Sequence, residues 1–249
     1  MKNYPYMANK KVKDHLIAAK KLDKIKDKTF NFISKNINQV SEYDVQQFIL
    51  EEFRKESLVS DKNKPIVASG KNTALVHYYP NKKSRIIQKE DLILIDIWAR
   101  VDKKCAYFVD ITWMAYSGKK VPKKIQKTFE HVIKARDLAI KFIEYNLDRK
   151  YHPKTSEIDA TARNHLKSKK IEKFFLHKLG HSLGTGGCHG RFFNFSKKGK
   201  TRLKPNIPFT IEPGIYFKNQ FGIRSEIDCY VKNHKLIITT QLQNKLVKL

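Results

Sequence analysis

An aspartate in the middle of an apolar strand is the feature that most constrains this chain. Asp96 lies in the stretch LILIDIW, whose other residues are all apolar and which predicts a buried strand. A buried carboxylate is costly unless it is paired, protonated or bound to a metal ion. The fold must therefore provide Asp96 with a counter-charge, a proton or a cation.

A second aspartate lies on the neighbouring strand of an expected hairpin. Asp110 begins the motif DITW in a strand predicted over residues 105–112, and residues 102–104 form the turn that joins it to a strand predicted over residues 92–101. A single aspartate in a strand is usually a structural hydrogen-bond acceptor, and this alternative stays open for each of them. Two aspartates on paired strands, with two more acids in later strands, instead favour a metal site.

Two glutamates extend the set of candidate ligands. Glu212 ends a short apolar strand just before a Pro-Gly turn, and Glu226 lies in the strand-like motif GIRSEID. For Glu226, an ordinary ion pair with Arg224 is the alternative. With His181 added, four carboxylates and one imidazole form a donor set that suits a pair of hard or borderline divalent cations.

The chain contains several histidines near these motifs. The spacing of His177 and His181 in HKLGH is similar to the zinc-protease motif HExxH, but the glutamate is absent and the glycines around His181 disfavour a helix. We therefore expect His181 in a Gly-bounded turn. Two further histidines, His77 and His189, each follow a Gly-containing turn and are candidates for the wall of a cleft.

Length and cysteine content limit the remaining possibilities. A chain of 249 residues can bury one large core, and we expect residues 1–249 to form a single domain. Three cysteines are an odd number without metal-type spacing, which fits a reducing compartment better than a disulfide framework. Cys188 precedes His189, but no activating pattern surrounds it, so we expect a passive thiol.

The net charge of +27 does not by itself indicate a nucleic-acid-binding protein. Lysines are spread along the whole chain without a recognised nucleic-acid motif, so we expect weak, salt-sensitive attraction and no specific nucleic-acid partner. No apolar run has the length of a membrane span, and the N-terminal residues contain no apolar stretch of the secretory type. We therefore expect a cytoplasmic protein with no membrane partner.

The predicted elements occur twice in the same order. In the first half, a helix over residues 10–35 and a second helix with Ser41 as its N-cap precede the hairpin. In the second half we expect helices over residues 123–146 and from Thr155 or Ser156 to Ser168, strands at 174–177, 209–211, 215–217, 223–231 and 236–239, and a loop at 190–208. The repeated order predicts an α+β domain with internal pseudo-twofold symmetry.

In their order, these motifs resemble those of the pita-bread metallopeptidases, the family of methionine aminopeptidases, Xaa-Pro aminopeptidases and prolidases. The resemblance is carried by GHSLG, FTIEPGIY, FGIRSEID and the hairpin with its two aspartates, and covers about residues 65–231. The segment ASGKNTALVHYYP is closer to the Xaa-Pro branch than to the methionine branch. The resemblance implies the pita-bread fold, with two halves around a curved antiparallel sheet, and a catalytic domain without the separate N-terminal domain of many relatives.

The resemblance also implies a role for each candidate. The implied ligands of two divalent metal ions are Asp96, Asp110, His181, Glu212 and Glu226. A water or hydroxide between the ions would be the nucleophile, and Glu212 would carry its proton. His77 and His189 would hydrogen-bond the substrate carbonyl or the tetrahedral intermediate. Manganese is the expected metal, with cobalt, iron and zinc as alternatives.

Three features depart from the family's pattern. The separation of Asp96 and Asp110 is longer than usual, which predicts an extended hairpin loop. Trp113 stands in DITW, where DITR is more frequent. His189 has an unusual offset within its motif and is followed by Gly190 instead of an acidic residue.

These features predict a dinuclear-metal exopeptidase that acts on small peptides, with Xaa-Pro bonds as its expected substrates. A methionine aminopeptidase is the alternative within the same class. A non-catalytic binding module on the same fold, or a metal-free creatinase-like hydrolase, is disfavoured because all five ligand positions are intact. The sequence leaves the oligomeric state open, with a homodimer among the expectations.

Overall fold

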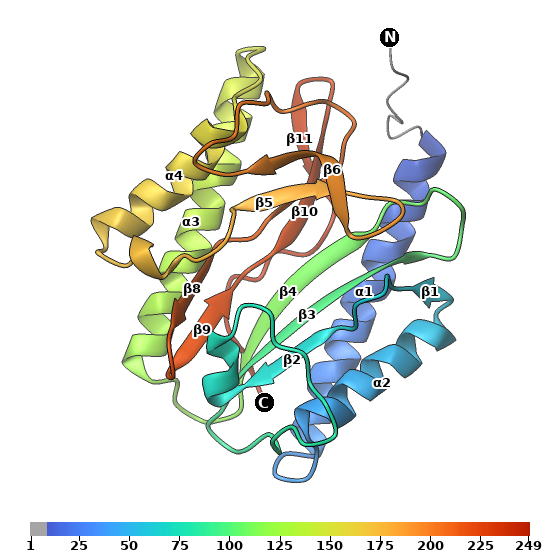
Figure 1. Ribbon diagram of the computed structural model, residues 1–249, viewed down its shortest axis with the longest axis vertical. Helices are drawn as coiled ribbons and strands as arrows, with labels where there is room; N and C mark the ends of the chain where they lie inside the picture. The colour runs from blue at the N-terminus through green and yellow to red at the C-terminus, as the bar shows by residue number, and fades with distance from the viewer. Residues whose placement is uncertain (1–8) are drawn as a thin grey trace.

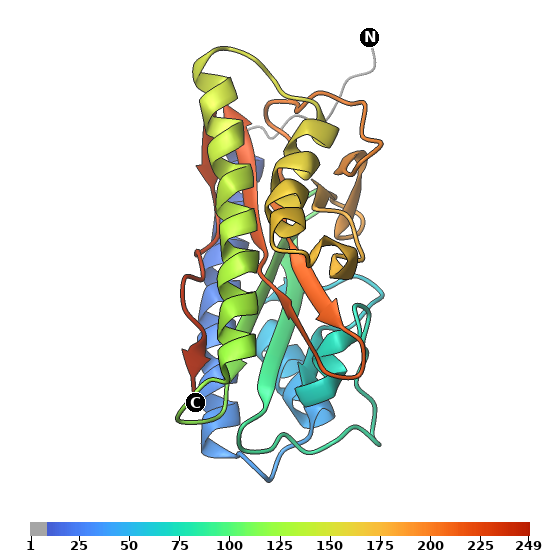
Figure 2. The ribbon, with the colours of Figure 1, turned by 90° about the vertical axis from the view of Figure 1, so that its left-hand side faces the viewer.

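The computed structural model describes residues 9–249, which form two five-stranded β-sheets and a two-stranded hairpin between two pairs of helices. Figure 1 shows one helix pair on each side of the strands, and Figure 2 views the molecule from the side of α3 and α4, which lie in front of the strands. The helices are α1 (Asn9–Lys35), α2 (Glu42–Lys55), α3 (Lys123–Asp148) and α4 (Thr155–Ser168). None of the helices within residues 9–249 has the length and apolar character needed to cross a lipid bilayer.

The strands follow the repeated order that the sequence predicts. The first sheet contains β1 (Leu58–Val59), β2 (Ile66–Ser69), β3 (Leu92–Val101), β4 (Val109–Tyr116) and β12 (Val247–Lys248). The second sheet, in the order β11-β10-β7-β5-β6, contains β5 (Gly180–Leu183), β6 (His189–Phe195), β7 (Phe209–Ile211), β10 (Ile227–Lys232) and β11 (Lys235–Ile238). A separate hairpin pairs β8 (Gly214–Phe217) with β9 (Phe221–Arg224). Two short 3₁₀ helices are η1 (Gly70–Ala74) and η2 (Glu172–Phe174).

The central strand β3 is buried on both faces, which explains its almost continuous apolar sequence. Because side chains alternate along a strand, Ile93, Ile95 and Ile97 pack into the core formed with α1 and α2. The intervening Leu94 and Trp98 belong to a second core that includes α3 and α4. Asp96 shares the face of this second core, away from α1 and α2.

The connection between β3 and β4 is longer than the turn predicted at residues 102–104. Residues 102–108 join the strands, and β4 begins at Val109, not at residue 105 as expected. The antiparallel register pairs Asp96 with Thr112 and Trp98 with Asp110. Both aspartates therefore project from the same face of the sheet, as diagonal cross-strand neighbours.

The prediction of a strand at residues 174–177 is wrong. Residues of this run form η2 and an irregular segment, and Arg163 of α4 donates hydrogen bonds to the carbonyl oxygens of Phe175 and His177, at 3.3 and 2.7 Å. The ring of Phe174 lies 4.6 Å from that of Phe217, whereas Leu176 is exposed. An arginine thus takes the carbonyl groups that a neighbouring strand would otherwise pair.

The prediction of a turn at His181 is also wrong, because His181 lies within the buried strand β5. A Cβ atom on Gly180 would lie 2.2 Å from the carbonyl oxygen of Thr210. The glycine therefore permits close backbone packing between β5 and the chain at β7, and does not mark a turn.

Three further boundaries differ from expectation. The strand predicted over residues 223–231 is two strands, β9 and β10, which Ser225 and Glu226 separate. The loop predicted at residues 190–208 contains most of β6. In α4, Lys154 takes the N-cap position, so the expected caps Thr155 and Ser156 lie inside the helix.

Trp113, the residue that makes the motif DITW and not DITR, is partly buried against α1. The Nζ atom of Lys26 lies 3.7 Å from the centroid of its ring, and Lys26 itself is buried. This cation–π contact joins the first helix to the outer face of β4.

The N-cap expected at Ser41 is confirmed and generates a stability prediction. Ser41 Oγ accepts a hydrogen bond from the backbone N–H of Asp44 at 3.1 Å, and Asp44 Oδ2 accepts from the backbone N–H of Ser41 at 2.8 Å. Ser41→Ala should lower the free energy of unfolding by about 1 kcal/mol, because it removes half of this capping box. Denaturant unfolding measures the change, and Ser34→Ala at an exposed position of α1 is the control, expected within about 0.5 kcal/mol of wild type.

Candidate metal centre

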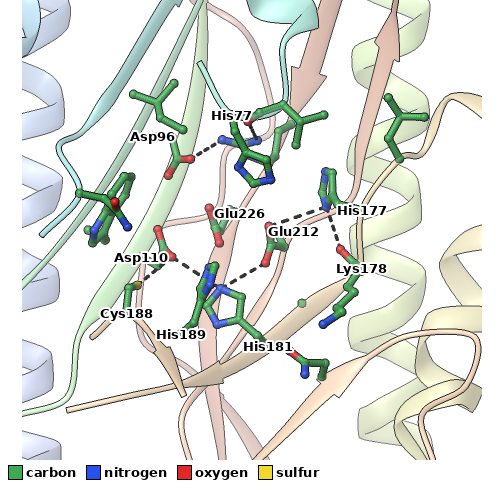
Figure 3. A pocket seen from close by; sticks show the side chains of 18 of the residues that line it. His77, Asp96, Asp110, His177, Lys178, His181, Cys188, His189, Glu212 and Glu226 are labelled. Carbon is green, nitrogen blue, oxygen red and sulfur yellow. Dashed lines mark hydrogen bonds and ion pairs between the residues drawn. The ribbon is translucent and has the colours of Figure 1, made fainter. Parts of the chain in front are cut away.

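All seven residues that the sequence predicts for the site line one cavity of about 820 Å³. Its wall includes Asp96, Asp110, His181, Glu212 and Glu226, together with His77 and His189. Figure 3 shows the four carboxyl groups facing a common space, with the histidines around it. The fold therefore gathers side chains from both sheets into one pocket.

Asp96 is held by an arginine from the other half of the chain. Its Oδ2 atom accepts a short hydrogen bond from Nη2 of Arg224, whereas its Oδ1 atom is buried without a hydrogen-bond partner. Arg224 also donates from Nε to Thr112 Oγ1, at 3.0 Å. Arg224 thus forms an ion pair with Asp96 and not the ion pair with Glu226 that was the alternative from the sequence.

Asp110 lies at the centre of the cluster. Its Oδ2 atom is 3.8 Å from Nε2 of His181 and 3.0 Å from the sulfur of Cys188, and its Oδ1 atom is buried without a hydrogen-bond partner. Its backbone N–H donates to Oδ2 of Asp228, at 2.9 Å. Within residues 9–249, ligand atoms of Asp110, His181 and Glu226 all lie within 4.8 Å of one another, close enough to share a metal ion.

Glu226 occupies the short gap between β9 and β10. Its backbone N–H donates to the carbonyl oxygen of Thr112 at 3.3 Å, and its Oε2 atom accepts from Thr112 Oγ1 at 2.7 Å. This isolated bridge links the second half of the chain to β4. The break between the two strands therefore directs Glu226 toward the aspartates.

His181 has the tautomer that metal coordination requires. Burial lowers its pKa to about 3, so the ring is neutral. Its Nδ1–H donates to the carbonyl oxygen of Ser182 at 3.1 Å, which leaves Nε2 unprotonated and facing the carboxylates. Nε2 lies 3.4 Å from Oε1 of Glu212.

Glu212 follows the end of β7, where the backbone turns at Pro213. Its Oε1 atom accepts a hydrogen bond from Thr210 Oγ1 at 3.0 Å. Thr210 also accepts the backbone N–H of His181 through the same oxygen, at 3.1 Å. One threonine thus sets the relative position of two candidate ligands.

His77 and His189 are exposed on the wall of the cavity. Each was expected at the wall of a cleft because it follows a Gly-containing turn. His77 lies in a turn after η1, and His189 begins β6. The ring centroids of His189 and His181 are 4.1 Å apart. Both exposed rings are accessible to a molecule that enters the cavity.

Sequence reasoning missed two residues that support this site. His177 receives a hydrogen bond from the Tyr216 hydroxyl at 2.9 Å, and its Nδ1 atom is 3.9 Å from Glu212 Oε2. Its spacing from His181 was the available signal, but we used it only to reject HExxH. Asp228 is fully buried, and its position two residues after Glu226 on a strand was the corresponding signal.

Ionising all of the carboxyl groups at once is energetically unfavourable, because they are buried close together. Burial, and then repulsion from Asp96 and Asp228, raises the pKa of Asp110 well above its ordinary range. Burial, and then repulsion from Asp110 and Glu212, raises the pKa of Glu226 in the same way. Burial raises the pKa of Glu212 to about 7, although Arg224 opposes the shift.

These residues fit divalent cations. Asp96 Oδ1 and Asp110 Oδ1 are buried oxygens without hydrogen-bond partners, and an unprotonated imidazole nitrogen lies among the carboxyl groups. Unpaired buried carboxylates are expensive, and cations would provide both the missing charge and the missing partners. Oxygen donors with one imidazole suit manganese, iron, cobalt or zinc.

The raised pKa values predict how the metal-free protein responds to pH. The ordinary pKa of histidine is about 6.5, so above about pH 7.5 the buried histidines are largely neutral in both the folded and unfolded states, and the carboxyl groups dominate. Because Asp110 and Glu226 bind more protons in the folded state than in the unfolded state, the free energy of unfolding should fall as the pH rises from 7.5 to 9, by up to about 1.4 kcal/mol per pH unit for each group that stays protonated in the folded protein.

Thermal unfolding in a chelating buffer measures this dependence, and Glu226→Gln should reduce the slope. Added Mn²⁺ should flatten it, since cations stabilise the ionised carboxylates. A metal-free protein whose stability rises over this range would contradict the electrostatic description.

Comparison with known proteins agrees with the geometry. The chain is 32% identical over 161 residues to an Xaa-Pro dipeptidase of Pyrococcus furiosus, and the match covers 65% of this chain and 42% of the relative. It superposes on a prolidase from Thermococcus sibiricus with a TM-score of 0.85 and 29% identity, which covers 97% of this chain and 62% of the prolidase. An X-Pro aminopeptidase from Thermotoga maritima gives a TM-score of 0.84 at 25% identity, with coverage of 98% and 64%.

These matches confirm the expected pita-bread fold. In each of them the chain spans less than two thirds of the other protein's length. The sequence model of metallopeptidase family M24 matches residues 15–233, which include all seven candidate residues. The chain therefore belongs to metallopeptidase family M24.

Proposed function

We propose that this chain is the metallopeptidase domain of an Xaa-Pro peptidase, which binds two divalent cations and hydrolyses the N-terminal peptide bond of small peptides. The observation that carries the proposal is the meeting of four carboxyl groups and one neutral imidazole in one cavity, with two buried oxygens left without partners. The proposed ligands are Asp96, Asp110, His181, Glu212 and Glu226. Manganese is the proposed metal because most of the donors are hard oxygens.

Two cations in this donor set would lower the pKa of a bound water and polarise the scissile carbonyl. The chain's own groups account for the remaining steps. Glu212, whose pKa lies near neutrality in the metal-free protein, accepts a proton and returns it to the leaving amine. His77 and His189 line the cavity, where they can donate hydrogen bonds to the oxyanion that develops on the substrate carbonyl.

Support for proline after the cleaved bond comes from the named relatives, an Xaa-Pro dipeptidase and a prolidase. An Xaa-Pro bond is a tertiary amide without an N–H group, so an enzyme cannot use that hydrogen bond to position the bond. This chemistry favours a dedicated site whose binding depends on the amino terminus and the carbonyl group.

Replacing a proposed ligand should abolish turnover while the fold is retained. Asp110→Ala and Glu226→Ala each remove a carboxylate from the centre of the cluster, and His181→Ala removes its nitrogen donor. Activity on an Xaa-Pro peptide with added Mn²⁺ measures the effect, and circular dichroism checks the fold. Glu130→Gln, at an exposed position of α3, is the matched control and should keep wild-type turnover. Normal activity in any ligand variant would refute the assignment.

His77→Ala should reduce kcat by about 10²–10³-fold if His77 stabilises the developing oxyanion. Metal content should stay at the wild-type level, because His77 is not a proposed ligand. Steady-state kinetics combined with metal analysis separates the two effects. A loss of metal in this variant would assign His77 to the ligand set instead.

Substrate preference is the most direct test of the proposed specificity. We expect Xaa-Pro dipeptides and tripeptides to be cleaved faster than Met-Ala peptides under the same metal conditions. Faster cleavage of Met-Ala would favour a methionine aminopeptidase. Absence of bound Mn²⁺ after purification and reloading would favour a non-catalytic binding module.

A further inference from the structure

Cys188 lies in the cavity wall but has no place among the five proposed ligands. Its sulfur is 3.0 Å from Oδ2 of Asp110, and its side chain is 4% exposed. Figure 3 shows Asp110 between Cys188 and Glu226, so the thiol lies on the side of this carboxylate away from Glu226. The passive thiol expected from sequence therefore contacts the central residue of the site.

The backbone around Cys188 is anchored to the same strands that carry the aspartates. The N–H of Cys188 donates to Asp61 Oδ2 at 3.2 Å, and Asp61 Oδ1 accepts from Trp98 Nε1 at 3.0 Å. Trp98 is the cross-strand partner of Asp110. These contacts close a ring that runs from β3 through Asp61 and Cys188 back to β4.

A second anchor lies on the other side of Cys188. The carbonyl oxygen of Cys188 accepts from the backbone N–H of Gly184 at 2.9 Å, and the carbonyl oxygen of Gly184 accepts from the backbone N–H of Phe108 at 3.0 Å. Phe108 lies two residues before Asp110. The loop that carries the thiol is thus fixed at two points, to β3 through Asp61 and to Phe108, just before β4, through Gly184, which holds the sulfur at Asp110.

We propose that Cys188 is a positioning residue of the metal centre, whose thiol donates a hydrogen bond to Asp110 Oδ2 and so fixes the orientation of this carboxylate. The thiol satisfies one oxygen, while Asp110 Oδ1 stays buried without a hydrogen-bond partner and is left for a cation. Groups that hold a metal ligand from outside typically change metal affinity by about 10–100-fold when they are removed. This inference rests on the proposed function, because it requires the centre to bind metal.

The test compares Mn²⁺ affinity in matched variants, with free Mn²⁺ measured by electron paramagnetic resonance. Cys188→Val keeps an apolar side chain of similar size but removes the donor, and should weaken Mn²⁺ binding by about 10-fold, since a thiol is a weak donor. Cys188→Ser keeps a donor and should restore most of the affinity. Thermal unfolding of the metal-free proteins should place both variants close to wild type.

Three results would overturn this inference. Wild-type affinity in Cys188→Val would show that the hydrogen bond does not matter. Equal weakening in Cys188→Ser and Cys188→Val would assign the effect to packing. A sulfur-to-cobalt charge-transfer band in the Co²⁺-loaded wild type, lost in Cys188→Ser, would make the sulfur a direct ligand instead of a hydrogen-bond donor.

A second variant covers the case in which Cys188→Val does not fold. Asp61 is half-buried outside the strands, and Asp61→Ala removes the acceptor that holds the Cys188 backbone. We expect this variant also to weaken Mn²⁺ binding. Unchanged binding would contradict the role given to the contacts that run from β3 through Asp61 and Cys188 to β4. A wild-type chain that binds no Mn²⁺ would overturn both proposals, whereas a wild-type chain that binds it as tightly as Cys188→Val overturns only this one.

Discussion

The burial of four like-charged side chains in one cavity is the constraint on which the rest of this structure depends. Carboxylates at this depth repel one another and have lost most of their hydration, so the pKa values of Asp110 and Glu226 are raised well above their ordinary range. One cation is built into the protein, where Arg224 pairs with Asp96. The remaining charge has no protein partner of opposite sign among the contacts described, and divalent cations would compensate it.

The architecture of the first sheet makes this arrangement possible. Because β3 is covered on both faces, its isoleucines can pack against α1 and α2 while Asp96 faces the cavity. The register between β3 and β4 then brings Asp110 to the same face. The second half of the chain contributes its acids where strands end or break, at Glu212 after β7 and at Glu226 between β9 and β10.

Each candidate ligand is held by a neighbour that is not itself a candidate. Thr112 contacts Glu226, Thr210 contacts Glu212, and the carbonyl oxygen of Ser182 fixes the tautomer of His181. Asp110 has the Cys188 thiol at its side chain and the Asp228 carboxylate at its backbone. Such contacts set the orientation of carboxylates and imidazoles before a metal ion binds, which is how surrounding groups tune metal affinity in proteins.

The sequence by itself determined the order of helices and strands, the buried strand around Asp96 and the Ser41 cap, because strand alternation and capping are local patterns. Short motifs in the sequence also pointed to the five candidate ligands, which line one cavity. Sequence-based prediction failed at residues 174–177 and at His181, where contacts from Arg163 and Thr210 decided the local conformation. Only the tertiary structure decided that Arg224 pairs with Asp96, 128 residues away in the sequence, and that Cys188 meets Asp110. Pairings between distant segments depend on how the sheets pack, and no local pattern in the chain encodes them.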